Sequence, residues 1–198
     1  WTEVNDLNTA RIAAGMTGTQ TSTLAFAGIL FPGSSTNITE SWDGTSWTEV
    51  SDMNTSRFYL AASGADNTSS LGFGGTNVIA NTESWNGSSW TEVNNVNTAR
   101  GSLIGVGVQT LALVAGGQSA PRTAAVELWD GSSWTETTDM SNAANNRGGA
   151  GSQTSALAFG GRADPPGSFN YLNATEVWNG STWTEVNNLN TARNLMGS

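Results

Sequence analysis

One tryptophan motif recurs through the whole chain. It has the form Glu-x-Trp-[Asp/Asn]-Gly-[Ser/Thr]-[Ser/Thr]-Trp, it repeats every 43 to 49 residues, and it contains eight of the nine tryptophans; Trp1 stands at its second Trp position. A period of this size is typical of stacked supersecondary units, each of which buries its apolar face only against its neighbours. The paired tryptophans are Trp42/Trp47, Trp85/Trp90, Trp129/Trp134 and Trp178/Trp183. We therefore predict a single repeat array, with units of about 1–46, 47–89, 90–133 and 134–182 and a partial fifth unit, 183–198.

Two further landmarks recur in each unit. One is Asn-Thr-[Ala/Ser]-Arg, and the other is an apolar run that closes on glycine, as in Leu71-Gly-Phe-Gly-Gly75. The spacing from the second Trp to the last Gly is 27 or 28 residues, whereas the spacing from that Gly to the next Glu varies from 8 to 15. Almost all variation in length is therefore confined to one connection. The first landmark ends at Arg11, Arg57, Arg100 and Arg193.

The segments between these landmarks have the pattern of short strands. Trp-Thr-Glu-Val alternates in polarity, and the Leu-Ala-Phe-Gly-Gly run is continuously apolar, as expected for a strand buried on both faces. Asp-Gly or Asn-Gly between two Trp-bearing segments is a strong hairpin signal. Four strands per unit and several units in series predict an all-β fold, a β-propeller of about four blades. The apolar strand should be buried, and Trp-Thr-Glu-Val should be outermost.

The phase of the repeat bears on ring size. The chain begins with an outermost strand at Trp1 and has another at Trp183, although a closed four-bladed ring needs only one of them. This duplication favours a window from a larger ring. A closed four-bladed domain is the alternative.

Glycine pairs, tryptophans and arginine at these spacings resemble the kelch repeat. Gly74-Gly75, Trp85, Trp90 and Arg100 occupy the corresponding places, and the resemblance covers all four units. Two departures are Trp where kelch repeats usually have Tyr, and Ala27 in place of one glycine. The Ser/Thr/Asn-rich composition and the sequence of the repeated motif also resemble kelch-like arrays in structural proteins of marine bacteriophages. The resemblance implies a propeller fold, a partner held by loops on one face, and a virion or extracellular location.

Composition excludes several classes of function. The chain has a net charge of −9, and its seven basic residues are all Arg, which disfavours nucleic acid and anionic membranes as partners. No apolar run has the length of a membrane span. Since there is no His or Cys, nucleophilic relays and typical zinc sites are excluded. A carboxylate repeated in every unit also does not form the single asymmetric constellation that catalysis needs. We expect a non-enzymatic protein without cofactor or metal.

The repeated residues have structural and functional interpretations. The tryptophans could stack on sugars, but packing of the core and hairpins is favoured because so few Leu and Ile are available. The repeated arginines could bind anions, but bracing of unit junctions through a Glu or carbonyl groups is favoured. In the fourth unit Ala144 aligns with Arg100, so that unit either uses Arg147, three residues on, or lacks the brace.

Candidate recognition residues lie in the variable connections 29–39, 76–82, 118–126 and 162–175. Such loops should project from one face, where binding residues concentrate over a rigid scaffold. The alternative is that these loops vary by neutral drift and have no binding role. We expect a structural or recognition propeller whose partner is a protein or glycan on a cell or virion surface, with self-assembly as a further option. The alternative is a lectin with one sugar site per blade. The candidate contact residues are Phe31, Arg122, Arg162, Asp164, Phe169 and Tyr171.

Overall fold

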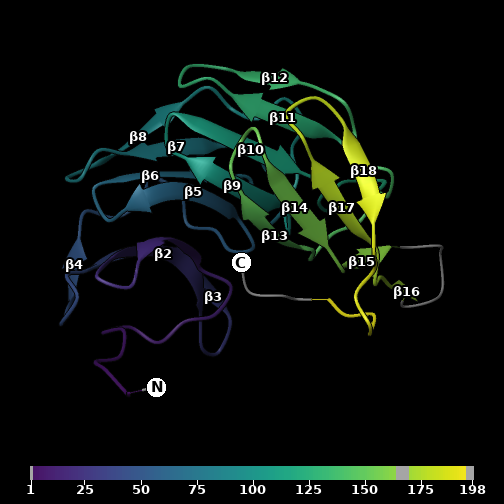
Figure 1. Ribbon diagram of the computed structural model, residues 1–198. Coiled ribbons are helices and arrows are strands. Elements are labelled where there is room, and N and C mark those ends of the chain that lie inside the picture. Colours follow the sequence, from purple (N-terminus) through teal and green to yellow (C-terminus); the bar gives the residue numbers. More distant parts are fainter. Residues whose placement is uncertain (1, 164–169, 195–198) are drawn as a thin grey trace.

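The chain folds into four similar β-sheets. The computed structural model describes residues 2–163 and 170–194, and all regular structure in these ranges is β-strand (Figure 1). Four antiparallel sheets have four strands each, and two short strands form a separate hairpin. Within the same ranges no helix is long and apolar enough to span a membrane. The predicted all-β class is confirmed, and the arrangement is consistent with that of a propeller.

The strands of each sheet follow one another in chain order. The first sheet contains β1 (Gly15–Thr19), β2 (Ser22–Leu30), β3 (Ser34–Trp42) and β4 (Trp47–Val50). The second contains β5 (Ala61–Asp66), β6 (Ser69–Phe73), β7 (Thr82–Trp85) and β8 (Trp90–Val93). The third contains β9 (Ile104–Val108), β10 (Leu111–Ala115), β11 (Val126–Trp129) and β12 (Trp134–Glu136). The fourth contains β13 (Gly148–Gly151), β14 (Ala156–Phe159), β17 (Thr175–Trp178) and β18 (Trp183–Val186), with the hairpin β15 (Arg162–Ala163) and β16 (Asn170–Tyr171) inserted before β17.

The motif with two tryptophans forms the hairpin between the third and fourth strands, which we call the Trp hairpin. In the first sheet, an oxygen of the Asp43 carboxylate accepts the backbone N–H groups of Thr45 and Ser46, both at 2.8 Å. Gly44 takes a φ of 95°, which glycine adopts without a steric penalty. Trp42 and Trp47 consequently lie directly opposite each other. The same turn is built on Asn86, Asp130 and Asn179.

The second strand of each sheet contributes buried apolar residues to the core. In β2, for example, Leu24, Ala25, Phe26 and Ala27 are all fully buried. The strand with Trp-Thr-Glu-Val is at the edge of every sheet. Both features match the strand order predicted from the sequence, because a strand paired on both sides and covered on both faces has no polar face to present.

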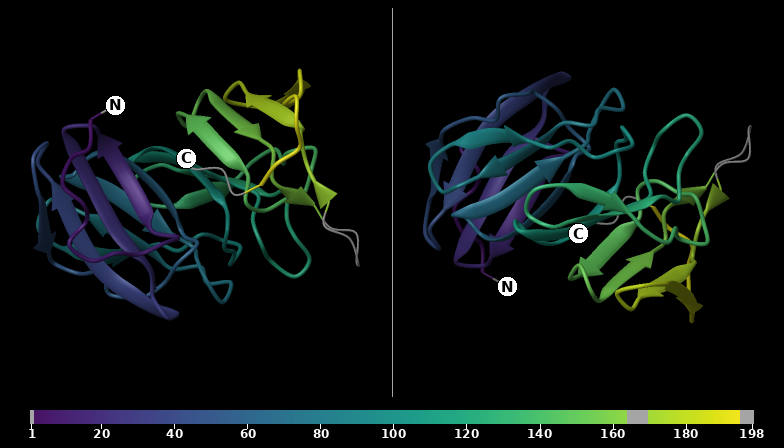
Figure 2. Two further views of the ribbon diagram at one scale, coloured as in Figure 1. Left: turned by 90° about the horizontal axis from the view of Figure 1, so that it is seen from below. Right: turned by 90° about the horizontal axis from the view of Figure 1, so that it is seen from above.

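The four sheets pack face to face along an arc. The first strands of the sheets lie side by side, with β1 next to β5, β5 next to β9, and β9 next to β13. In Figures 1 and 2 the first and fourth sheets stand at the two ends of this arc. An apolar cluster fills each of the three junctions between consecutive sheets. The first of them contains Leu24, Phe26, Met53, Leu60, Trp85 and Trp90.

Candidate functional site

Buried ion pairs account for the repeated arginines and glutamates. In the second sheet, Arg57 Nη2 lies 3.0 Å from Glu83 Oε1, and both side chains are almost completely buried. The other oxygen of Glu83 accepts the backbone N–H of Asn54 at 2.7 Å. Arg57 also donates to the carbonyl of Asn81 at 2.7 Å. A carboxylate and a guanidinium that satisfy each other and the surrounding backbone are unavailable to a ligand, so the pair is a structural brace.

The brace recurs in every sheet, although in the fourth it comes from a different chain position. The equivalent pairs join Arg11 to Glu40 at 3.1 Å, Arg100 to Glu127 at 2.7 Å and Arg147 to Glu176 at 2.8 Å. Ala144 keeps the backbone role of Arg100, since Gly117 N–H donates to the Ala144 carbonyl as Gly75 N–H donates to that of Arg100. Arg147 then reaches the carboxylate from three residues further on.

Arg193 departs from the predicted role. Arg193 is exposed, and its guanidinium donates to the backbone carbonyl of Thr191 rather than to a buried carboxylate. The physical reason is that each arginine pairs with a glutamate in the sheet that follows it, and the described residues contain no sheet after Arg193. By contrast, burial lowers the pKa of the Arg57 and Arg100 guanidinium groups. The neighbouring Glu83 and Glu127 carboxylates offset only part of this decrease.

The tryptophans serve as packing groups. Trp85 is 1% exposed and Trp129 is 2% exposed. Their rings lie 5.5 and 5.3 Å from the partner rings Trp90 and Trp134. Trp42, Trp178 and Trp183 are likewise buried, and among the described tryptophans only Trp47 is half-buried. An indole ring that stacks on a sugar needs an open face, which these pairs do not present.

The variable connections all start from the same end of the sheets, which we call the loop face. The chain enters each first strand at this end, and the residues there pair with those that follow the glycines: Ile12 with Ile29, Gly101 with Gln118, and Asn145 with Arg162. The connection 29–39 was predicted as a loop, but most of it extends β2 and β3 into a long hairpin. Phe31 lies in the turn of that hairpin and is 98% exposed.

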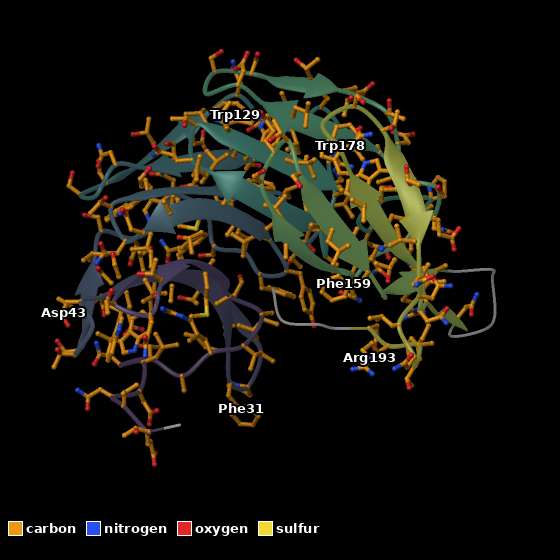
Figure 3. The ribbon with its side chains drawn as sticks, in the orientation of Figure 1. Phe31, Asp43, Trp129, Phe159, Trp178 and Arg193 are labelled. Atoms are coloured by element: carbon orange, nitrogen blue, oxygen red, sulfur yellow. The ribbon has the colours of Figure 1, made fainter. Side chains whose placement is uncertain are left out.

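Two of the predicted contact residues lie together at the fourth sheet, and a third, Arg122, comes from the connection of the third sheet. Arg162 in β15 is paired in register with Tyr171 in β16, and Tyr171 is 46% exposed. Burial lowers the pKa of Arg122, and the positive charge of Arg162 lowers it further, so the two guanidinium groups are electrostatic neighbours. Phe31 stands at the opposite end of the arc (Figure 3). Asp164 and Phe169 lie outside the described residues.

A hollow between the first strands of the sheets opens at the loop face, and sequence reasoning missed it. It has a volume of about 490 Å³, and the four sheets contribute Ala13, Tyr59, Ser102 and Asn146 to its lining. These residues stand two positions after Arg11, Arg57, Arg100 and Ala144. The side chain at this position differs in all four units, but so does that of the preceding residue, so variability alone does not single the position out.

The backbone of these four hollow-lining positions is unusual. All four have a φ between 51° and 55°, in the left-handed region that non-glycine residues rarely occupy. Inter-sheet hydrogen bonds hold them there: Asn146 N–H donates to the Ser102 carbonyl, Ser102 N–H to that of Tyr59, and Tyr59 N–H to that of Ala13, at 3.0, 2.8 and 3.1 Å. The main chain therefore fixes the position of each side chain at the hollow.

The side chains that line the hollow define the chemistry of this face. Among the described residues no group of three or more carboxylates, histidines or cysteines could hold a metal ion. The lining of the hollow is mostly apolar and includes Met16, Leu60 and Leu103, with Tyr59 as its one aromatic ring. Its polar side chains are Ser102, Asn146 and Arg147. Comparison with family models and with curated proteins found no match to this chain.

Proposed function

We propose that this chain is a kelch-like β-propeller or an arc of one. Four-strand meanders packed face to face, with their first strands adjacent, support this proposal. The glycine pairs support it as well. At Gly117, for instance, an added Cβ would come within 3.0 Å of the Gly101 carbonyl oxygen, so the close approach of successive sheets requires glycine.

The proposed function is recognition of a protein or glycan on a cell or virion surface, by a non-enzymatic virion or extracellular scaffold. One observation carries it: almost all variation in length among the units falls in the connections of the loop face, and the side chains on the rim of the hollow differ from unit to unit. The braces, Trp hairpins and glycines are repeated almost without change. A scaffold kept constant beneath a variable surface is the usual arrangement of a binding protein.

Two parts of the loop face are suited to different contacts. The hollow offers Tyr59, Ser102 and Asn146, whose hydroxyl and amide groups suit a polar partner such as a glycan or a peptide backbone. Beside it, Arg122 and Arg162 provide positive charge on a chain of net charge −9. Tyr171 adds an exposed aromatic ring of the kind that anchors interfaces.

A lectin with one sugar site per sheet is the weaker candidate. Such a lectin needs one exposed aromatic platform in each unit, whereas the tryptophans available for that role are packed in pairs within the junctions. A single binding site at the hollow fits the structure better, because the equivalent residues that the four sheets place on its rim differ from one another.

Loop-face variants provide the test. In one variant the connection 162–175 is replaced by the short 76–82 connection, and in another Tyr59 is changed to alanine. Thr91→Ala, an exposed position on the edge strand β8, is the matched control. Each protein is screened against a glycan array and intact host cells, with folding followed by circular dichroism.

We expect folding to be unchanged in all variants. Binding should be lost or weakened about tenfold or more in the loop-face variants and retained in the control. Binding that survives both loop-face changes, or that disappears in the control, would contradict recognition at this face. Sugar binding at one equivalent per sheet would favour the lectin instead.

A further inference from the structure

Each occupied junction shows what the two facing sheets contribute. At the first junction the earlier sheet provides Phe26, whose ring lies 4.7 Å from that of Trp90 in the next Trp hairpin. Trp90 Nε1 donates to Thr39 Oγ1 of the earlier sheet at 3.0 Å. The segment between the sheets bonds to both, since Met53 N–H donates to the Asn37 carbonyl and Asn54 N–H to Glu83.

The far face of the fourth sheet carries the first half of such a junction. Phe159 occupies the place of Phe26 but is only partly buried. Thr175 is paired in register with Phe159, as Thr39 is with Phe26. The segment 187–193 is already seated, with Leu189 N–H donating to the Asn173 carbonyl at 2.8 Å and Arg193 N–H to that of Leu172 at 3.0 Å. Phe159 and Arg193 are both labelled in Figure 3.

The near face of the first sheet carries the complementary half. Its Trp hairpin presents Trp47, which is half-buried, whereas its counterparts Trp90, Trp134 and Trp183 are between 6% and 9% exposed within junctions. Glu40 on the adjacent strand is the carboxylate that a junction arginine pairs with. At one end there is a partly exposed phenylalanine and an exposed arginine that pairs with no carboxylate among the described residues. They match a partly exposed tryptophan and a carboxylate at the other end.

The two ends also carry copies of the same segment. Residues 1–11 and 183–193 differ only at Asp6, which is Asn188 in the second copy. In the first copy Asn8 N–H and Thr9 N–H donate to Glu40 at 2.7 and 3.3 Å, and Arg11 pairs with it. In an occupied junction one segment makes both sets of bonds, so only one of the two copies fits when these ends meet.

We propose that the far face of the fourth sheet binds the Trp hairpin of the first sheet of a second copy of this chain, head to tail. Segment 187–193 then displaces residues 2–11 of that second copy, and Arg193 pairs with its Glu40. The occupant is a second copy because the first and fourth sheets of one copy stand at opposite ends of the arc in both views (Figures 1 and 2). The interface is heterologous and self-propagating, since each copy has one face of each kind.

The segment 2–11 acts as a plug on Glu40 and limits this association. Removal of residues 1–11 should therefore strengthen it by about tenfold or more, equivalent to about 1.4 kcal/mol. Adding Arg193→Ala to the deletion should reverse the gain. Sedimentation velocity over a range of concentrations measures both effects. A deletion variant that stays monomeric at all concentrations, or that becomes a more compact monomer by closing on itself, would overturn the proposal.

Two full-length variants test the interface without the deletion. Phe159→Asp disables the far face of the fourth sheet, and Trp47→Glu disables the near face of the first. Each variant alone should be monomeric under conditions in which the unmodified chain associates, whereas an equimolar mixture should form a 1:1 dimer that does not grow. Thr91→Ala, on the exposed edge strand β8, is the control and should associate as the unmodified chain does.

A mixture that fails to dimerise would refute head-to-tail docking. So would association of either variant alone at the level of the unmodified chain, or an unmodified chain that never associates. The result does not depend on recognition at the loop face, since Tyr59 and the hollow take no part in the docking.

Discussion

Replacing Arg57 by alanine should be among the most destabilising single changes in the chain. Its guanidinium donates to the carbonyls of Gly72, Gly74 and Asn81 and to Glu83, and its side chain is 1% exposed. Alanine leaves the Glu83 carboxylate buried without its cation and removes one donor from each of three carbonyls. Breaking a buried pair by removing one partner costs about 3–5 kcal/mol, and we expect a loss in this range.

The other arginines of the same motif supply a graded comparison. Arg11 donates to the Ala25 carbonyl at 3.2 Å and pairs with Glu40, but its Nε and Nη1 are buried without partners. Since it makes fewer bonds than Arg57, Arg11→Ala should cost about 1–2 kcal/mol less. Arg193 is exposed, so Arg193→Ala should change stability by no more than about 0.5 kcal/mol.

Urea unfolding gives the three free energies of unfolding. Tryptophan fluorescence and circular dichroism should give coincident transitions, which allows the values to be compared directly. If Arg57→Ala costs no more than Arg193→Ala, or if the order of Arg11 and Arg57 is reversed, the buried ion pair does not hold the sheets as argued.

Three further changes probe other parts of the fold. Backbone N–H groups lower the pKa of Asp130 to about 2, so its turn should stay intact above the ordinary Asp pKa and loosen as pH falls through 2. An NMR titration should show a midpoint near this pH. Asp130→Asn should remove the titration but keep the turn, because Asn86 builds the same turn. Gly117→Ala should cost about 1–3 kcal/mol by denaturation, since φ is 117° and the new Cβ meets a carbonyl; a neutral result would contradict close sheet approach there. Phe26→Ala should cost about 3–5 kcal/mol and Phe159→Ala clearly less, because of these two residues only Phe26 is fully buried against a tryptophan. Equal losses of stability would argue against an open face on the fourth sheet.

Sequence reasoning succeeded where the determinant is local and repeated. The hairpin turn needs only a side-chain oxygen at Asp43 and a glycine after it, and both are visible in the sequence. The strand order followed from the same regularity. The inner strand and the edge strand differ in whether apolar residues are continuous, as Leu24–Ala27 show.

Reasoning from sequence fell short where spatial partners decide. The Arg147 brace starts from a different backbone position, which is possible because a long side chain can reach the same carboxylate from more than one position. Alignment alone could not decide whether the fourth unit uses Arg147 or lacks the brace. Arg193 has the motif but not the partner, since the glutamate belongs to the next sheet in space. The hollow at Tyr59 depends on how four sheets meet.

The left-handed residues at the hollow have a consequence for how new specificities arise in this chain. Because main-chain bonds between sheets hold Ala13, Tyr59, Ser102 and Asn146, the fold does not rely on what their side chains are. Those positions are therefore open to exchange by mutation, apart from proline, which has no N–H and a negative φ, and β-branched residues, which disfavour a positive φ. A randomised library at these four codons would sample many surfaces on one unchanged framework.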